Sequence, residues 1–400
     1  MKKNNKTPKL RFSGYTDDWE QRKVGDNIVE YTEKTTINNQ YPVLTSSRRG
    51  IFFQTDYYNG NQIASTDNTG YNIVPYGYFT YRHMSDDEIF HFNINDITEN
   101  GIVSTLYPVF TTDENLDSRY LQYQLNYGKE FAKYAILQKQ GGSRTYMYLN
   151  KLKELRLTIP NSVEEQKKIS VYFMKLDHLI TLHQRKLEKL QNMKKSCLQK
   201  MFPKDGATVP EIRFSEVQGD WEERTLGSCF DERLESLPDG ELLSVTIGSG
   251  IKKFSELDRH DNSNTDKSKY KRVCIGDIAY NSMRMWQGAS GRSPYEGIVS
   301  PAYTVVKPIG DIDTQFFAYM FKKKEIIHLF EINSQGLTSD TWNLKYPAFS
   351  KIVVRVPRNV EEQSRIARFL LELDELISCT EQEIEITKRM KKGCLQKMFV

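Results

Sequence analysis

Apolar residues recur at a four-three spacing along two long stretches of the chain, residues 164–202 and 361–399. This spacing is typical of a helix that presents one apolar stripe to another helix. Neither helix can cover its stripe alone, so we expect the two helices to pack along each other as a coiled coil. The stripe comprises Ile169, Phe173, Leu176, Ile180, Leu187 and Leu190 in the first stretch, and Ile366, Leu370, Leu373, Ile377 and Ile384 in the second. Polar residues interrupt it at matching positions, His183 and Lys194 in the first stretch and Thr380 and Lys391 in the second.

Both stretches begin with the same signal. Each follows a strand-like run that ends in proline, and Ser162 with Glu165, like Asn359 with Glu362, has the spacing of a capping box. At 1.5 Å per residue, each helix is expected to be about 55–60 Å long.

The order of features in the first half of the chain returns in the second half at an offset of about 200 residues. The run Pro-x-(Leu/Ile)-Arg-Phe-Ser occupies residues 8–13 and 210–215, and Gly-Ile-Val-Ser occupies residues 101–104 and 297–300. We therefore expect two tandem units, each a globular part followed by one long helix.

Short β-rich runs broken by Gly, Asn and Asp dominate each globular part, and residues 118–125 and 314–321 have the pattern of shorter amphipathic helices. A mixed fold of the α+β or α/β class fits this pattern. The expected division is residues 1–160 for the first globular domain, 161–203 for the first long helix, 204–357 for the second domain and 358–400 for the second helix.

Composition adds little to this picture. The chain has 400 residues and a formal net charge of only +4, so charge alone is a weak argument for a nucleic-acid partner. The polar start has no apolar segment of the signal-peptide kind, and no run approaches the length of a membrane span. We expect a cytoplasmic protein.

A search for catalytic motifs finds none. The chain has no Gly-x-x-x-x-Gly-Lys-(Ser/Thr) loop, no His-Glu-x-x-His, no paired-cysteine metal spacing, no Gly-x-Ser-x-Gly, and no Asn-Pro-Pro-Tyr of an amino-methyltransferase. His178 and His183 have a helical spacing that permits a metal, but no third ligand accompanies them. We assign no catalytic residue and no metal site.

The globular parts do contain many long polar side chains in glycine-broken segments. Arg, Lys, Asn and Gln form pairs of hydrogen bonds with base edges, and Lys and Arg neutralise phosphates, so these segments are candidates for DNA binding. The alternative is that they are ordinary solvated loops. The candidates are Arg48, Arg49, Asn61, Gln62, Arg82, Gln138, Lys139 and Arg144 in the first unit, and Lys252, Lys253, Lys269, Lys271, Arg272, Asn281, Arg284, Gln287 and Arg292 in the second.

This duplicated order resembles the specificity subunit of type I restriction-modification systems. The resemblance covers the whole chain. It rests on the pattern E-Q-x-x-I-x-x-x-(F/L)-x-x-L-D-x-x-I at residues 165–180 and 362–377, and on L-Q-K-M-F at 198–202 and 395–399. It rests also on Gly-Ile-Val-Ser and on the runs that begin at Gly77 and Gly276.

The resemblance implies a non-enzymatic subunit whose two target-recognition domains each read one half of a split DNA sequence in the major groove. It implies that the two helices pack antiparallel, relate the units by a pseudo-twofold axis and set the gap between the half-sites. It also implies two methyltransferase subunits that use S-adenosylmethionine, and two restriction and translocation subunits that use ATP and Mg²⁺. Because the polar segments of the two units differ, we expect an asymmetric target.

Two other classes of protein remain open at this point. One is a single-chain restriction-modification enzyme, which would need a cofactor motif that the sequence lacks. The other is an adaptor whose helices bind another protein and whose globular parts do not contact DNA.

Overall fold

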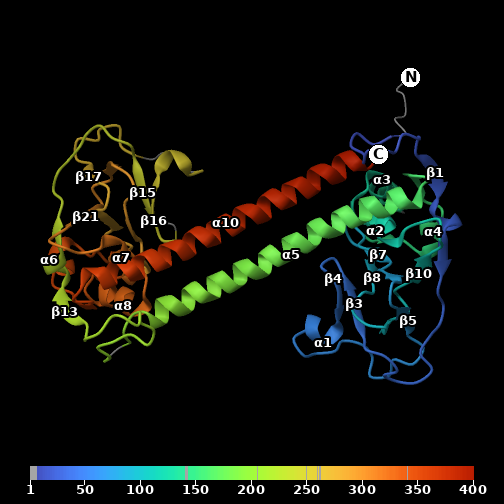
Figure 1. The fold of residues 1–400 in the computed structure, drawn as a ribbon, viewed down its shortest axis with the longest axis horizontal. Coiled ribbons are helices and arrows are strands. Elements are labelled where there is room, and N and C mark those ends of the chain that lie inside the picture. The colour runs from blue at the N-terminus through green and yellow to red at the C-terminus, as the bar shows by residue number, and fades with distance from the viewer. Residues whose placement is uncertain are drawn as a thin grey trace. The chain divides into compact units, whose positions relative to one another are not determined.

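The computed structural model describes residues 7–139, 143–204, 206–248, 250–258, 260, 263–339 and 341–400. The chain divides into two compact units, unit 1 with residues 1–184 and 383–400, and unit 2 with residues 185–382. Each unit therefore contains a globular part and one segment of each long helix. These helices, α5 (Val163–Lys200) and α10 (Val360–Met398), are green and red in Figure 1.

The globular part of unit 1 is built on a four-stranded antiparallel sheet in the order β2-β10-β6-β8. These strands are β2 (Ile28–Glu30), β10 (Val109–Thr112), β6 (Phe79–Thr80) and β8 (Asn93–Ile94). Antiparallel pairs join β1 (Glu20–Lys23) to β12 (Arg156–Ile159), β3 (Leu44–Ser47) to β4 (Gly50–Phe53), β5 (Asn72–Pro75) to β9 (Asn100–Val103), and β7 (Met84–Ser85) to β11 (Thr145–Tyr146). The helices are η1 (Val24–Asp26), α1 (Gln54–Tyr57), α2 (Ser118–Tyr127), α3 (Lys129–Leu137) and α4 (Leu149–Lys153).

Unit 2 repeats this plan with the sheet order β14-β21-β18-β19. The strands are β14 (Phe230–Glu232), β21 (Tyr303–Pro308), β18 (Ile278–Asn281) and β19 (Ser290–Arg292). The pairs are β13 (Glu222–Thr225) with β22 (Val353–Val356), β15 (Leu243–Thr246) with β16 (Gly250–Lys253), and β17 (Lys271–Val273) with β20 (Gly297–Val299). The helices are α6 (Leu226–Cys229), η2 (Phe254–Glu256), η3 (Met285–Gln287), α7 (Thr314–Met320), α8 (Lys324–Ile332) and α9 (Tyr346–Phe349). The predicted mixture of helices and strands is confirmed.

The two long helices pack together, as predicted. In unit 1 the hydroxyl of Tyr172 on α5 lies 3.4 Å from the Cys394 Sγ atom on α10, and Nδ1 of His183 lies 3.0 Å from Oε2 of Glu383. Residue numbers thus rise along α5 as they fall along α10, so the two segments are antiparallel within this unit. In unit 2, Lys194 of α5 forms an ion pair with Asp374 of α10.

The apolar stripe of each helix is covered by more than the other helix. Ile169, Phe173 and Leu176 are buried in the core of unit 1, and Ile366, Leu370 and Leu373 are buried in the core of unit 2. Ile384 is also buried, whereas Ile180, Leu187, Leu190 and Ile377 are only half-buried. The stripe is most deeply buried where a helix end rests on a globular part.

The two lysines that interrupt the stripe form ion pairs between the helices, whereas the Thr380 hydroxyl donates to the Leu376 carbonyl of its own helix at 2.7 Å. Lys391 binds Asp177 in unit 1, just as Lys194 binds Asp374 in unit 2. A tyrosine completes each cluster: Tyr123 of α2 donates to Oδ2 of Asp177 at 2.6 Å, and Tyr319 of α7 donates to Oδ2 of Asp374 at 2.8 Å. Burial, with the neighbouring carboxylate, raises the pKa of both tyrosines. Each cluster therefore ties both long helices to a globular part.

The predicted capping boxes are only half formed. The backbone N–H of Glu165 does donate to Oγ of Ser162, at 3.3 Å, but the Glu165 carboxylate does not return to the cap. It accepts instead from Nε and Nη2 of Arg11, at 2.6 and 2.8 Å, and from Nε1 of Trp19, at 3.4 Å. A buried carboxylate needs a charged partner, and an arginine fork supplies two parallel hydrogen bonds, so this pairing replaces the local one.

In the second unit the equivalent glutamate also binds an arginine and a tryptophan instead of the helix cap. Glu362 accepts from Nε and Nη2 of Arg213, both at 2.8 Å, and from Nε1 of Trp221 at 3.2 Å. At the cap, Asn359 accepts from the N–H of Glu361 rather than from that of Glu362. The repeated Arg-Phe-Ser segment is thus an anchor that joins the start of each unit to its long helix.

Candidate functional site

Three segments of unit 1 bring most of the candidate residues of that unit together. They are the β3–β4 hairpin (residues 44–53), the turn at residues 82–91 and the described part of the loop at residues 138–148. A hollow of about 520 Å³ between the first two is lined by Arg48, Arg49 and Arg82, with Tyr57, Tyr58 and Tyr107 beside them. The third segment joins through the β7–β11 pair. We call these three segments the loop face of unit 1.

The basic side chains of this face differ in their partners. Nη1 of Arg48 donates to Oδ2 of Asp87 at 2.8 Å, Nε of Arg144 donates to Oδ1 of Asp86 at 2.8 Å, and Lys139 pairs with Glu88. The guanidinium of Arg49 lies 4.4 Å from the ring centroid of Tyr57, a cation–π contact. Arg82 is exposed, and its side chain forms no hydrogen bond or ion pair with another described residue.

Sequence reasoning missed three stacked aromatic rings on the same face. The ring of Tyr148 lies 5.1 Å from that of His83 and 5.8 Å from that of Tyr146, with interplanar angles of 25° and 11°. Tyr146 is 36% exposed and Tyr148 is 48% exposed. The alternation Tyr-Met-Tyr at residues 146–148 was the available signal, because Met147 is buried and its two neighbours point the other way.

Unit 2 has an equivalent loop face on the equivalent elements. It consists of the turn at residues 281–288 and the described parts of the β15–β16 hairpin (residues 243–253) and of the loop at residues 334–343. Asn281, Arg284 and Gln287 all lie on the turn, where Oδ1 of Asn281 accepts from the N–H of Met283 at 3.0 Å. Trp286 packs edge-on against Trp342, with ring centroids 5.3 Å apart, and so joins the turn to the loop.

Lys322, which follows α7, holds this second face together. Its Nζ donates to the carbonyl oxygens of Ile247 at 3.0 Å, Gly288 at 2.6 Å and Ser290 at 2.8 Å. Burial lowers the pKa of Lys322 to about 8, and the like charge of Lys194 adds to this shift. No sequence signal indicates this role, because three consecutive lysines are typical of a solvated segment.

Replacing Lys322 with methionine is expected to loosen the loop face of unit 2. Three carbonyl groups lose a donor, and leaving a buried polar group without its hydrogen bond costs about 1–3 kcal/mol. Hydrogen exchange measured by mass spectrometry should show faster exchange in peptides that cover residues 285–292. The matched control is Lys324→Met, since Lys324 is exposed. Equal exchange in both variants and the wild type would contradict this role.

Some of the remaining candidate residues lie outside the two loop faces. Lys271 and Arg272 lie on β17, where they pair with Glu232 at 3.4 Å and Glu235 at 3.2 Å. Other candidates also have partners in their own unit. Gln138 donates to the Tyr134 carbonyl, Arg292 donates to the Thr314 hydroxyl, Asn61 donates to the Tyr58 carbonyl, and Lys253 lies over the Tyr295 ring. Gln62 follows α1, Lys252 lies on β16 next to Lys253, and Lys269 precedes β17.

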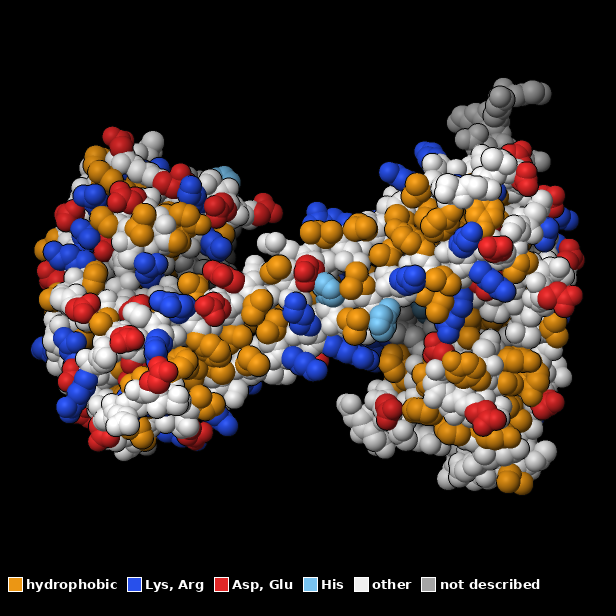
Figure 2. All heavy atoms as spheres, viewed as in Figure 1, with side chains coloured by type: hydrophobic (Ala, Val, Ile, Leu, Met, Phe, Trp, Pro, Cys, Tyr) orange, Lys and Arg blue, Asp and Glu red, His pale blue; other side chains and the backbone are white. Residues whose placement is uncertain are grey.

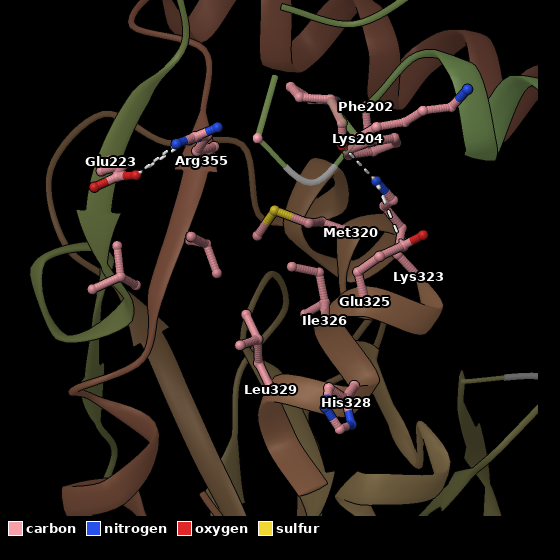
Figure 3. A pocket seen from close by; sticks show the side chains of 14 residues that line it. Phe202, Lys204, Glu223, Met320, Lys323, Glu325, Ile326, His328, Leu329 and Arg355 are labelled. Atoms are coloured by element: carbon pink, nitrogen blue, oxygen red, sulfur yellow. Dashed lines mark hydrogen bonds and ion pairs between the residues drawn. The ribbon is translucent and has the colours of Figure 1, made fainter. Parts of the chain in front are cut away.

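A separate cavity of about 330 Å³ in unit 2 contains none of the candidate residues. Figure 3 shows it between the end of α5 and α8, with Met320, Ile326 and Leu329 on its apolar wall. Its charged groups bind one another or the backbone: Arg355 pairs with Glu223 at 2.9 Å, and Lys323 donates to the Pro203 carbonyl at 3.1 Å. This hollow therefore belongs to the packing of α5 on the globular part.

The surface charge is mixed, and the described residues contain no group of metal ligands. On the face drawn in Figure 2, Lys and Arg are interspersed with Asp and Glu in both units. Among the residues that the structure describes, no three His, Cys, Asp or Glu side chains are grouped as metal ligands, and no helix is long and apolar enough to cross a membrane. Nδ1 of His183 faces Oε2 of Glu383 at 3.0 Å.

Comparisons with known proteins agree with this architecture. Over 98% of this chain and 99% of the other, the fold matches the crystal structure of a type I restriction-modification system S subunit from M. genitalium, with a TM-score of 0.58 and 15% identity. The fold is thus that of a type I S subunit. Residues 3–192 match the family model described as the type I restriction modification DNA specificity domain.

Two curated relatives come from Methanocaldococcus jannaschii. The type I restriction enzyme MjaVIII specificity subunit is 26% identical over 139 residues, which are 33% of this chain and 32% of that protein. The putative type I restriction enzyme MjaX specificity subunit is 23% identical over 294 residues, 69% of this chain and 66% of that protein. The chain thus spans less than two thirds of each relative. These similarities agree with the resemblance to type I restriction-modification specificity subunits that the sequence predicted.

Proposed function

We propose that this chain is the DNA specificity subunit of a type I restriction-modification complex and reads a bipartite, asymmetric target with one unit for each half. One observation carries the proposal: the two units repeat the same three-segment loop face on equivalent elements but fill it with different side chains. Arg48, Arg49 and Arg82 are prominent in unit 1, whereas Asn281, Arg284 and Gln287 are prominent in unit 2. A shared frame with different polar groups is what two different half-sites require.

The chemistry of the two faces supports base reading. Arginine binds guanine O6 and N7 through two hydrogen bonds, and asparagine or glutamine binds adenine in the same way. Joining two such readers in one chain makes the second binding event intramolecular, so two weak half-site contacts combine into one strong one when the gap is right. In this proposal residues 1–160 and 204–357 are the recognition domains, and residues 161–203 and 358–400 are the spacer helices.

We propose two equivalent docking surfaces for two methyltransferase subunits. Each unit has a hollow of about 480 Å³ beside the C-terminal part of one long helix. The two hollows are lined by residues at matching repeat positions: Ile180, Lys391, Lys392, Leu395 and Gln396 in unit 1, and Ile377, Lys194, Lys195, Leu198 and Gln199 in unit 2. Two copies of one partner fit two copies of one surface.

The chemistry of the complex is assigned to the partners. S-adenosylmethionine would be bound by the methyltransferase subunits, and ATP and Mg²⁺ by two restriction and translocation subunits. This chain would then be non-catalytic and would act on DNA in the cytoplasm. Incubating the purified chain with S-adenosylmethionine, Mg²⁺ and DNA should give neither methylation nor cleavage, whereas a single-chain enzyme would give at least one.

A gel-shift series distinguishes the specificity subunit from an adaptor that never contacts DNA. The full chain, with its methyltransferase partner, should bind duplex DNA, and the logarithm of its affinity should fall linearly with the logarithm of salt concentration because counterions are released. Arg284→Ala should weaken binding by about 1–3 kcal/mol, the value of one good base contact. The matched control is Arg358→Ala, an exposed arginine outside both loop faces. No duplex binding at low salt would refute the proposal.

A further inference from the structure

Three consecutive acidic residues on the loop face of unit 1 bind three of the basic candidates. Nε of Arg144 donates to Oδ1 of Asp86 at 2.8 Å, Arg48 binds Asp87, and Lys139 binds Glu88. The basic residues come from the β3–β4 hairpin and from the loop after α3, whereas the acids come from the single turn that follows β7. One short acidic segment thus neutralises charges from both other segments of the face.

The ion pair between Arg48 and Asp87 occupies the same guanidinium N–H groups that would bind DNA. Nη1 and Nη2 of Arg48 each donate to one carboxylate oxygen of Asp87, and Nη2 donates also to the Ile89 carbonyl at 3.3 Å. A guanine edge or a phosphate is gripped by the same pair of parallel N–H groups. Arg48 therefore cannot hold Asp87 and a nucleotide through this fork at the same time.

The acidic turn is held in place by its own contacts. The Ser85 hydroxyl donates to Oδ1 of Asp87 at 2.8 Å, and hydrogen bonds from Arg48 and Ser85 lower the pKa of the Asp87 carboxyl, which is charged at neutral pH. Glu88 adopts φ of 60°, in the left-handed region that residues other than glycine seldom occupy. Such a backbone persists only where the surrounding structure holds it.

The acidic segment is specific to unit 1. By the repeat that matches Met84 to Met283, Asp86, Asp87 and Glu88 correspond to residues 285–287, which are Met-Trp-Gln. No acid stands there, and Arg284 forms no ion pair with a described residue. The two units therefore offer an internal comparison.

We propose that Asp86, Asp87 and Glu88 occupy the DNA-binding groups of unit 1 in the free protein and are displaced when the first half-site binds. This inference rests on the proposed function. DNA must replace three ion pairs, so these acids lower the affinity of unit 1 and reduce its dependence on salt. Each exposed pair changes an equilibrium constant by up to about fivefold, so three of them are expected to change DNA affinity roughly tenfold or more.

The test is DNA binding by the full chain with its methyltransferase partner, across a salt series. The variant Asp86→Asn, Asp87→Asn, Glu88→Gln should bind a target duplex about tenfold more tightly at low salt, with a steeper salt dependence. The matched control, Asp26→Asn, Glu99→Gln, Glu114→Gln, removes three exposed acids of unit 1 outside the turn and should change affinity by no more than about twofold. A variant no tighter than this control overturns the inference.

A second comparison tests whether the gain in DNA affinity depends on Arg48, Lys139 and Arg144. In a chain that carries Arg48→Ala, Lys139→Ala and Arg144→Ala, neutralising the acids should yield less than about a threefold gain, since no ion pairs remain to be broken. An undiminished gain would mean general repulsion between the acids and DNA, and would also overturn the inference. Asp87→Asn alone, the smallest change, should still tighten binding about two- to threefold. Wild-type protein that binds no duplex would instead refute the proposed function itself.

Discussion

Removal of residues 383–400 is expected to unfold unit 1 while unit 2 keeps its structure. The reason is that the C-terminal end of α10 is part of the core of unit 1. Met398 is 3% exposed and Phe399 is 5% exposed, and the Phe399 ring lies 6.0 Å from that of Tyr120 and 5.7 Å from that of Phe173. The carbonyl of Lys397 also accepts from the N–H of Leu10 at 2.9 Å.

The size of the effect follows from the burial of these groups. Deleting one buried aromatic side chain costs about 3–5 kcal/mol, which is a large part of the 5–15 kcal/mol that stabilises a typical domain. Hydrogen exchange and limited proteolysis of the truncated chain should show lost protection in residues 79–159 and retained protection in residues 226–356. If unit 1 keeps its protection after truncation, residues 383–400 are not an essential part of its core.

Point variants give the matched version of this experiment. Phe399→Ala removes the ring from unit 1, and Phe202→Ala removes its repeat equivalent from unit 2, where it stacks on Phe316 with ring centroids 5.2 Å apart. Each variant should destabilise its own unit by about 3 kcal/mol and leave the other unit unchanged. A loss spread evenly over both units would mean that the units do not fold independently.

Exchange of the loop face of unit 1 for that of a homologous protein is expected to change one half of the recognised DNA sequence and leave the other half unchanged. All three segments of this face lie between residues 44 and 148. A graft of residues 24–144 would separate β7 from its partner β11, because the boundary falls just before Thr145. A graft of residues 24–148 keeps this pair and the stack of His83, Tyr146 and Tyr148 together.

The measurement is the adenine-methylation pattern of cells that carry the graft with an unaltered methyltransferase partner. The ungrafted chain and a graft of residues 222–356 are the controls, and the second graft should change the opposite half. If either graft changes both halves, or neither, recognition is not divided between the units.

The long helices could be predicted almost to the residue, because their signals are local. The predicted stretches 164–202 and 361–399 compare with α5 at Val163–Lys200 and α10 at Val360–Met398. A spacing of apolar residues and a preceding cap suffice to define a helix. The same local reasoning failed for Glu165 and Glu362, since their partners Arg11 and Arg213 lie far away in the sequence.

The candidate site could be predicted only as a set of residue types. The sequence names Arg48 and Arg144 as candidates, but nothing local indicates that Asp87 and Asp86 bind them. Lys271 and Arg272 are residues of the same types, yet in the structure they lie on β17, outside the loop face, and pair with Glu232 and Glu235. Contacts between residues far apart in the sequence decide which basic side chains are available to bind DNA. A single sequence does not reveal these contacts.

Selection of bound duplexes from a random DNA pool, with the full chain and its methyltransferase partner, tests the central claim most directly. A subunit with one recognition domain for each half-site should select two short, different sequences separated by a gap of fixed length in which no base is selected. One continuous sequence, two identical halves or no enrichment at all would contradict it.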